Sequence, residues 1–378
     1  MKNIVKKLLL LTPILLLLLI PQFITGAVNI GQNSDRPYGY ILESDYASIM
    51  NLPIKHDVIV AIIDSGINYN NPYIRDSVIG GYDYIDNDND PMDSENHGTG
   101  IAGIIGGKKN DYINVSGLFP GVKILNLRAV SDFAFEDAVA NSIRYAVDNG
   151  AKIINCSLGF STAYQVLIDA IEYADSKGVI IVGSAGNLNR EIDNYPASHP
   201  KTISVSGLNT SNERRLTTAT YGETVDYSTQ GSFDEVLQSD GTYSLRNGTS
   251  YSSAVMSAVI ARLLAYDDSL TKSSIISLLD QDGFELPILH GRKIGRKLNV
   301  TSLVNRYVTL ETKMIEMDDD RNNVVLEIEI AKEGSAVIRK VLKYAYVNGR
   351  RYSLHKEMPC EVVTMFSYNR HTRFFKWM

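Results

Sequence analysis

The sequence is poor in cysteine and tryptophan, with two cysteines and one tryptophan in 378 residues. Cys156 and Cys360 allow at most one bridge, so the fold cannot depend on a disulfide framework. The hydrophobic content of 44% is that of a globular core. A chain of this length accommodates one large domain and a smaller second one.

Long apolar runs are also missing beyond the N-terminus, which leaves no internal segment able to span a membrane. At the N-terminus, three lysines precede the apolar run 8–20, and small residues follow at 25–27. This order is typical of an export signal. We therefore predict that residues 1–27 are a signal peptide and that the protein is secreted. The alternative is an uncleaved segment that tethers the chain to the membrane, and this would be its only membrane contact.

Negative charge dominates most of the chain but not its last quarter. Residues 1–285 carry 20 Lys and Arg against 33 Asp and Glu, whereas residues 286–378 carry 17 against 10. Such a shift indicates a domain boundary near residue 290. Alternation at 324–330 and the turn pair Asn348-Gly349 indicate strands and a hairpin. We predict a small β-rich appendage over 300–378 that packs on the main domain, and no motif in it indicates nucleic-acid binding.

Three runs rich in Ile and Val have the length of strands, at 58–63, 153–156 and 179–182. Continuous β-branched runs of this kind are typical of parallel strands buried on both faces. The sequence therefore predicts an α/β fold with a mostly parallel central sheet. In such sheets the functional site lies at the carboxyl ends of the strands.

Three polar residues occupy positions that suit catalysis. Asp64 ends the first strand, His97 precedes a small-residue apolar helix, and Ser250 opens a second apolar helix. Taken singly, they read as a turn aspartate, a surface histidine and a helix cap. Their order along the chain, however, is one of the orders found in serine hydrolase triads. A serine hydroxyl needs a base within reach, and an imidazole held by a carboxylate can act as that base.

The residues around these positions resemble the three signature segments of the subtilisin-like serine proteases. The segments are Asp-Ser-Gly-Ile at 64–67, His-Gly-Thr-x-Ile-Ala-Gly at 97–103 and Gly-Thr-Ser-x-Ser at 248–252. The resemblance covers roughly residues 35–290. Each segment alone is a weak signal, but the three together are highly specific.

The resemblance implies a three-layer subtilisin-like domain over residues 56–290, preceded by a short N-terminal or pro segment at 28–55. It also implies that Asp64 orients the histidine and that His97 acts as general base and acid. In the same way it makes Ser250 the nucleophile and Asn187 the side-chain donor to the oxyanion. Where the family usually has proline, the present chain has Ala254, a change in the first helical turn that involves no proton transfer.

The resemblance further implies a groove that binds an extended polypeptide by main-chain pairing. The expected partner is therefore a polypeptide substrate. The residues expected to contact it are Ser157, Leu158, Gly159, Ala185 and Gly186. The floor of its primary pocket is expected within 188–196, where Glu191 and Asp193 either favour a basic substrate side chain or are solvated or paired with Arg190.

The segment that begins at Asp83 is strongly acidic. Clustered carboxylates repel one another unless they are solvated or bind a hard cation such as Ca²⁺, and thermitase-like members of the family carry a similar calcium loop. Both a structural calcium site and a solvated acidic loop are consistent with the sequence. No cofactor is needed for the chemistry. The tentative calcium ligands are Asp83, Asp86, Asp88 and Asp90.

Three functions are compatible with these features. The leading one is a secreted serine endopeptidase of broad action. The second is a protease dedicated to removing leader peptides or propeptides, because lantibiotic leader peptidases resemble this sequence as a class. The third is an inactive protein that holds extended peptides in the same groove, a hypothesis weakened by the intact set of catalytic residue types.

Overall fold

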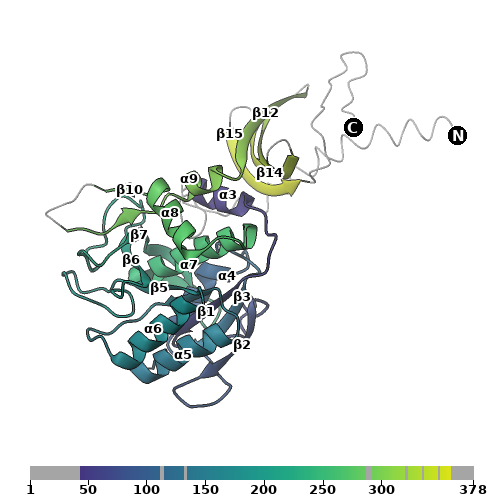
Figure 1. The fold of residues 1–378 in the computed structure, drawn as a ribbon. Coiled ribbons are helices and arrows are strands. Elements are labelled where there is room, and N and C mark those ends of the chain that lie inside the picture. Colours follow the sequence, from purple (N-terminus) through teal and green to yellow (C-terminus); the bar gives the residue numbers. More distant parts are fainter. Residues whose placement is uncertain are drawn as a thin grey trace. The chain divides into compact units, whose positions relative to one another are not determined.

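The computed structural model describes residues 43–110, 115–131, 134–286, 292–319, 322–333, 336–347 and 350–358 (Figure 1). The predicted signal peptide, residues 28–42 of the predicted N-terminal segment, and the turn pair Asn348-Gly349 lie outside the described residues. Within the described part, no helix is long and apolar enough to cross a membrane.

A nine-stranded sheet forms the centre of the described chain (Figure 1). Its strand order is β10-β11-β7-β6-β5-β4-β1-β3-β2, and all neighbouring pairs run parallel except β10 and β11. The strands are β1 (Ile59–Asp64), β2 (Val78–Asp83), β3 (Lys123–Arg128), β4 (Ile153–Cys156), β5 (Ile180–Ser184), β6 (Thr202–Leu208), β7 (Tyr227–Gln230), β10 (Phe284–Glu285) and β11 (Arg296–Lys297).

Helices cover both faces of this sheet (Figure 1). Successive side chains of a strand point to opposite faces. Accordingly, Val60 and Ile62 of β1 pack with α4 and α7, whereas Ala61 and Ile63 pack with α5 and α6. The helices are α3 (Glu43–Asn51), α4 (Gly98–Gly106), α5 (Glu136–Asp148), α6 (Gln165–Ser176), α7 (Thr249–Tyr266), α8 (Lys272–Asp282) and α9 (Val300–Asn305). The predicted three-layer α/β fold is thus confirmed.

Helix α3 belongs to the same hydrophobic core. Ile49 and Leu52 are buried in the cluster that contains α7. The guanidinium of Arg262, itself on α7, donates to the carbonyl oxygens of Ile49 at 2.8 Å and Leu52 at 2.6 Å. Residues 43–52, which the sequence assigned to an N-terminal segment, therefore pack directly against α7, the helix that carries the predicted nucleophile as its second residue.

The C-terminal region is an antiparallel sheet of four strands, as its alternating sequence predicts. Its second strand contains the predicted segment 324–330. The four-stranded sheet contacts the domain that contains the nine-stranded sheet. Its residue Glu333 accepts hydrogen bonds from Lys55 at 2.8 Å and from Tyr266 at 2.6 Å. The strands are β12 (Thr309–Asp319), β13 (Asn322–Glu333), β14 (Ala336–Val347) and β15 (Arg350–Met358).

The strand order determines where functional residues can meet. Strands β5, β4 and β1 are neighbours and run parallel, so their carboxyl ends lie at one edge of the sheet. Asp64 ends β1, Ser157 follows β4, and 185–187 follow β5. A hairpin formed by β8 (Ser232–Leu237) and β9 (Tyr243–Asn247) leads directly into α7.

Candidate active site

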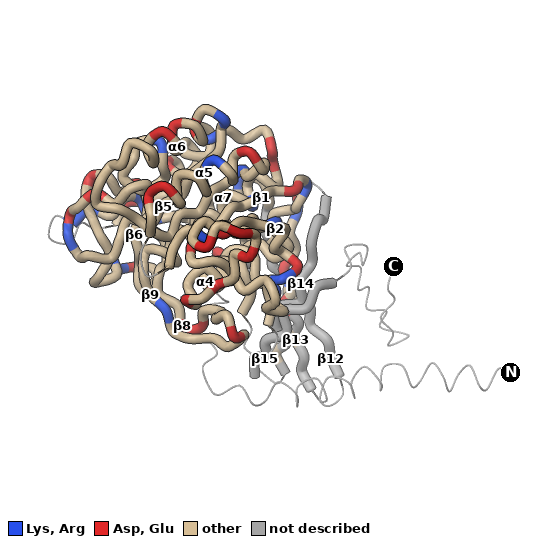
Figure 2. The backbone as a smooth tube through the Cα atoms, turned by 90° about the horizontal axis from the view of Figure 1, so that it is seen from below, with Lys and Arg blue, Asp and Glu red and all other residues tan. Residues whose placement is uncertain are grey.

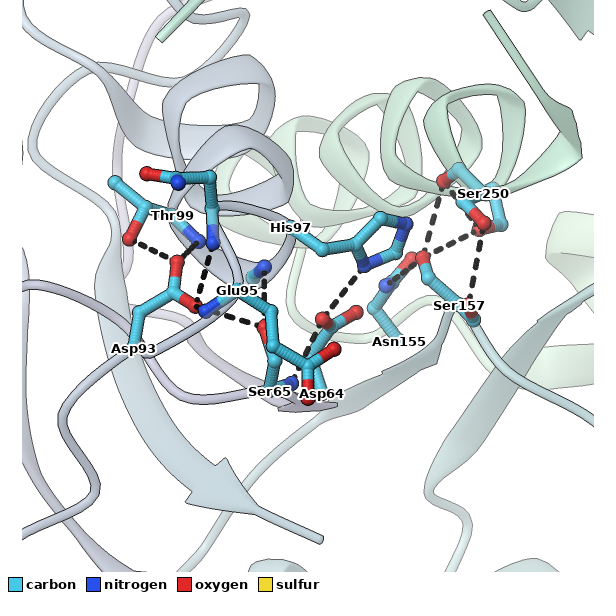
Figure 3. Close-up of polar contacts among 12 residues, drawn as sticks. Asp64, Ser65, Asp93, Glu95, His97, Thr99, Asn155, Ser157 and Ser250 are labelled. Carbon is cyan, nitrogen blue, oxygen red and sulfur yellow. Dashed lines mark hydrogen bonds and ion pairs between the residues drawn. The ribbon is translucent and has the colours of Figure 1, made fainter. Parts of the chain in front are cut away.

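Asp64 and His97 form a hydrogen-bonded pair at this edge (Figure 3). Asp64 Oδ1 lies 2.7 Å from His97 Nδ1, and the same oxygen accepts the main-chain N–H of Ser65 at 2.8 Å. The carboxylate is only 3% exposed. A buried carboxylate against one ring nitrogen fixes the histidine tautomer and leaves the other nitrogen for chemistry.

His97 immediately precedes α4, whose residues are all buried. The helix comes this close to β1 because Gly98 has no side chain, and a Cβ at that position would collide with the carbonyl oxygen of Gly66. The imidazole packs beside the ring of Tyr251, with 5.7 Å between ring centroids. About a third of the His97 side chain is exposed (33%), so a substrate can reach it.

The electrostatic surroundings change the basicity of His97. Burial of the ring lowers its pKa, because it disfavours the charged form. The charge and hydrogen bond of Asp64 raise it, and the carboxylates of Asp93 and Glu95 add to this effect. The result is a pKa of His97 above its ordinary value of 6.5.

Ser250 is the second residue of α7 and is nearly buried at 7% exposure. Its hydroxyl donates to the main-chain oxygen of Ser157 at 3.1 Å rather than to His97. Figure 3 shows the imidazole of His97 between Asp64 and Ser250. The structure thus brings the three predicted catalytic residues together, with the Asp–His bond formed and the serine hydroxyl held by a main-chain carbonyl.

Asn187 lies beside the start of α7. Its side-chain oxygen accepts the main-chain N–H of Thr249 at 3.0 Å, which orients the amide. Gly248, with a φ of 152°, permits the Asn187 amide to lie this close to the start of α7, because a Cβ at position 248 would be only 3.3 Å from Asn187 Nδ2. With its oxygen bonded, the amide of this exposed residue keeps its N–H groups for another acceptor.

The five predicted substrate-contacting residues lie on the two segments beyond β4 and β5. The Ser157 side chain is buried, and its hydroxyl donates to the main-chain oxygen of Ser250 at 3.0 Å, so this hydroxyl is bonded to the first turn of α7. Leu158 and Gly159 have no main-chain partner within the described residues and are accessible. Ala185 is buried and Gly186 is half-buried with a φ of 103°.

The acidic segment begins at the last residue of β2, and its aspartates are among the residues drawn in red in Figure 2. Its four predicted calcium ligands do not converge. A guanidinium nitrogen of Arg128 donates to both Asp83 and Asp86, at 2.5 Å each. Asp88 caps the N–H of Asp90, and no cluster of three or more acidic, histidine or cysteine side chains that suits a metal occurs in the described ranges. As arranged, these residues do not fit Ca²⁺, because Asp83 and Asp86 are paired with Arg128 and Asp90 accepts the hydroxyl of Tyr69.

Sequence reasoning missed Asp93, which the structure places at the centre of a buried network (Figure 3). Its Oδ1 accepts the hydroxyl of Ser65 at 2.9 Å, and its Oδ2 accepts the N–H of Thr99 at 2.9 Å. Ser239 in the turn of the β8–β9 hairpin donates to the same carboxylate at 3.1 Å. Asp93 therefore links the end of β1, the start of α4 and the hairpin that leads to Ser250.

A carboxylate at a helix start also interacts favourably with the helix dipole. Asp93 receives main-chain N–H groups from Glu95 at 3.0 Å and Asn96 at 3.1 Å, immediately before His97. No local capping pattern marks Asp93 in the sequence, because His97 and not Asp93 is the residue that immediately precedes α4. Nothing in the sequence showed its contact with Ser239, 146 residues further along the chain.

The fold is a three-layer α/β domain with a polar site at the carboxyl edge of a parallel sheet, and comparison with known proteins identifies its family. The family model described as the subtilase family matches residues 55–283. Thermitase of Thermoactinomyces vulgaris is 36% identical over 208 residues, which span 54% of this chain and 74% of thermitase. Subtilisin NAT of Bacillus subtilis subsp. natto is 30% identical over 234 residues, 59% of this chain and 60% of that protein.

The fold agrees with a solved structure as well. The crystal structure of a cold adapted subtilisin-like serine proteinase matches with a TM-score of 0.59 at 27% identity, covering 65% of this chain and 90% of the other. The chain belongs to the subtilase family, and its enzyme class is that of a subtilisin-like serine endopeptidase.

Proposed function

We propose that the protein is a secreted serine endopeptidase that cuts extended polypeptides, with Asp64, His97 and Ser250 as its catalytic triad. The observation that carries this proposal is the 2.7 Å bond between Asp64 and His97 beside the serine that opens α7. Asn187, fixed by its bond from Thr249, is the proposed side-chain donor to the oxyanion.

The first step transfers one proton and forms one bond. Ser250 Oγ leaves the carbonyl oxygen of Ser157, gives its proton to Nε2 of His97 and attacks the carbonyl carbon of the substrate peptide bond. The Nδ1–H of His97 stays bonded to Asp64, whose negative charge stabilises the imidazolium that forms. The raised pKa of His97 reflects the same stabilisation.

Negative charge then develops on the substrate carbonyl oxygen. The main-chain N–H of Ser250 lies in the first turn of α7, where N–H groups have no helical acceptor. The Nδ2 group of Asn187 is the second donor, and such preorganised donors stabilise the transition state. His97 next donates its proton to the leaving nitrogen as the carbonyl re-forms and the C–N bond breaks, which releases the amine product and leaves an ester on Ser250 Oγ. Water, deprotonated by His97, then attacks this ester, and the C–O bond to Ser250 breaks as His97 returns the proton to the serine oxygen.

The basicity of His97 predicts a pH profile. We expect the acid limb of kcat/KM to lie above 6.5, the ordinary histidine value. Only the neutral imidazole can accept the serine proton, so activity is lost as the pH falls through the raised pKa. The measurement is kcat/KM for an uncharged peptide substrate at constant ionic strength across neutral pH. An acid limb at or below 6.5 would contradict the proposed influence of Asp64.

Labelling with a fluorophosphonate tests the proposed enzyme directly. This reagent phosphonylates a serine only where a base activates the hydroxyl. We expect the native protein to be labelled once per chain, at Ser250, and heat-denatured protein to remain unlabelled. Absence of labelling in the folded protein would favour the inactive peptide-binding alternative.

The breadth of action separates the two enzymatic alternatives. A general endopeptidase degrades casein to many fragments, whereas a dedicated processing enzyme cuts a secreted precursor at one site. The main-chain groups of Leu158 and Gly159 support recognition of any extended peptide, because backbone pairing is independent of sequence. Side-chain selectivity must therefore come from the pockets.

The chain organisation is part of the proposal. We assign residues 1–27 to the export signal, 28–55 to a short N-terminal segment, 56–290 to the catalytic domain and 300–378 to the appendage. The family match at 55–283 supports the third of these. The catalytic steps need no metal or cofactor, and polypeptide is the proposed partner.

A further inference from the structure

We propose that the turn of the β8–β9 hairpin positions His97 for catalysis through Ser239, which binds Asp93 and Asn96 in the segment before the histidine. Ser239, Asp93 and Asn96 are together called the hairpin clasp. This role deepens the proposed function and rests on His97 as its general base. The three are positioning residues, because they act on the reaction through His97.

Ser239 is bonded by both its main chain and its side chain to the segment that leads into His97. Its main-chain N–H donates to Oδ1 of Asn96 at 3.0 Å, and its hydroxyl donates to Oδ2 of Asp93 at 3.1 Å. Its carbonyl oxygen accepts the side-chain amide of Asn68 at 2.7 Å. The turn is therefore held both to the loop before His97 and to the loop that follows β1.

Asp93 transmits this restraint to both partners of the Asp64–His97 bond (Figure 3). Its Oδ1 accepts the hydroxyl of Ser65 at 2.9 Å, and the same hydroxyl accepts the main-chain N–H of Gly98 at 3.0 Å. A hydroxyl has one hydrogen, so donation to Asp93 leaves a lone pair for Gly98. Because Ser65 follows Asp64 and Gly98 follows His97, one oriented hydroxyl joins the neighbours of the two bonded side chains.

The clasp also stabilises an unusual backbone conformation immediately before His97. Asn96 has a φ of 63°, in the left-handed region that few residues other than glycine and asparagine adopt. Its main-chain N–H donates to Oδ1 of Asp93 at 3.1 Å, while its side chain accepts the N–H of Ser239. These bonds fix the residue that sets the direction in which the chain enters α4.

A carboxylate suits position 93 because the groups around it are donors. Asp93 is 7% exposed, and both of its oxygens accept hydrogen bonds. An amide in its place would put an N–H against these donors, and main-chain N–H groups cannot reverse their role. The donors are the hydroxyls of Ser65, Thr99 and Ser239 and the main-chain N–H groups of Glu95, Asn96 and Thr99.

The hairpin leads to the proposed nucleophile as well. Strand β9 ends at Asn247, and α7, which carries Ser250 as its second residue, begins two residues later. The guanidinium of Arg246 on β9 donates to the side chain of Gln238 at 2.6 Å, which joins β9 to the residue before Ser239. The clasp therefore connects the segment of the nucleophile with that of the general base, and it constrains the distance over which the proton moves.

Packing between the hairpin and the catalytic helices supports the same arrangement. Strand β8 lies so close to α4 that a Cβ on Gly100 would be 2.9 Å from a methyl group of Val236. The ring of Tyr251, next to Ser250, packs with the His97 imidazole and with Phe233 of β8, at centroid distances of 5.7 Å and 6.4 Å. The hairpin thus reaches the base through side-chain packing in addition to the clasp.

Asp93 carries a charge, and its effect differs from that of its hydrogen bonds. The carboxylates of Asp64, Asp93 and Glu95 raise the pKa of His97, whereas burial of the ring lowers it. Tyr251 beside the ring stays neutral, since burial raises its pKa to about 12. Neutralising Asp93 should therefore move the acid limb of kcat/KM to lower pH, because the imidazolium loses part of its stabilisation.

The test measures kcat, KM and the pH profile of three clasp variants of the full chain with a peptide substrate. Asp93→Asn should lower kcat about 10²-fold, the loss expected when a catalytic group shifts by about 1 Å, with KM close to native. Ser239→Ala and Asn96→Gly each remove one hydrogen bond of the clasp and no charge, and glycine adopts the φ of residue 96 without strain. Each should lower kcat about fivefold and keep the native acid limb.

Asp240→Asn is the matched control. Asp240 lies next to Ser239 in the same turn, is exposed, and bonds only within the turn, to the N–H of Thr242 at 2.9 Å and its hydroxyl at 2.6 Å. This variant removes a carboxylate from the hairpin without altering the clasp, so kcat and the pH profile should remain native. Adding Ser239→Ala to Asp93→Asn should cause little further loss, because the two residues act through one contact.

Two results would overturn the proposal. Native kcat in both Ser239→Ala and Asn96→Gly would show that the hairpin does not hold His97. A displaced acid limb with native kcat at the pH plateau in Asp93→Asn would show that Asp93 acts by charge alone. The first two variants change residues at or near the surface and give the answer should Asp93→Asn fold poorly.

Fluorophosphonate labelling of the native protein separates this role from the proposed function. A native protein that labels, together with clasp variants of native kcat, contradicts the hairpin clasp alone. A native protein that does not label contradicts the proposed function, and with it the role of His97 on which the clasp acts.

Discussion

Replacing Ser250 with alanine is expected to lower kcat about 10⁶-fold, the loss that subtilisin itself shows when its nucleophile is removed. The hydroxyl lies in the first turn of α7, and Figure 3 shows Ser250 on the opposite side of the His97 imidazole from Asp64. Binding of substrate should be retained, because the main-chain groups of Leu158 and Gly159 are untouched. The measurement is kcat and KM for a peptide substrate at high enzyme concentration.

The matched control is Ser257→Ala on the same helix. Its hydroxyl is buried and donates to Oδ1 of Asn155 at 2.9 Å, so it reaches the site only through Asn155, whose amide donates to the Ser157 hydroxyl at 2.8 Å. Its removal should cost on the order of 1–2 kcal/mol of stability and leave catalysis close to native. Residual activity in Ser250→Ala above a few per cent of the native rate would show that another group supplies the nucleophile.

Replacing Asp64 with asparagine is expected to lower kcat about 10⁴-fold, the magnitude known for this exchange in another serine protease. An amide in place of the carboxylate can present an N–H to His97 Nδ1, which stabilises the wrong tautomer. It also removes the charge that raises the pKa of His97. The acid limb of the remaining activity should therefore move to lower pH, a shift that a purely structural role of Asp64 would not produce.

Asp57→Asn serves as the control for this exchange. Asp57 lies just before β1, is exposed, and pairs with Lys123 on the surface at 2.6 Å. Exposed ion pairs contribute little to stability, so the control should keep both rate and pH profile. Equal losses in the two variants would mean that the effect of Asp64→Asn comes from strand β1 and not from His97.

The proposed catalytic residues could be located in the sequence because each of them marks the end of a strand or the start of a helix. Asp64 follows an apolar run, and His97 and Ser250 precede runs of small and apolar residues. These patterns involve only residues that are close together in the sequence, so they can be recognised without the structure. The parallel sheet followed from the same apolar runs, and the four-stranded C-terminal sheet followed from alternation along β13.

The contacts that could not be predicted all join distant parts of the chain. Arg128 reaches Asp83 because β2 and β3 are paired, and this pairing puts a guanidinium where the sequence suggested a calcium ion. Asp93 reaches Ser239 through the position of a hairpin. Asn194 reaches Gly159 only because two loops meet beyond β4 and β5.

Local patterns in the sequence account for the helices and strands and for the residue types proposed for the reaction, because apolar periodicity and helix starts are local properties. The surroundings of these residues depend on the tertiary structure, which pairs Arg128 with Asp83 and Asp86 and buries Asp64 beside His97. Electrostatic and packing energies depend on distances of a few ångströms between residues that are far apart in the chain. Those distances are set by strand order and loop placement, which the residues near Ser250 do not encode.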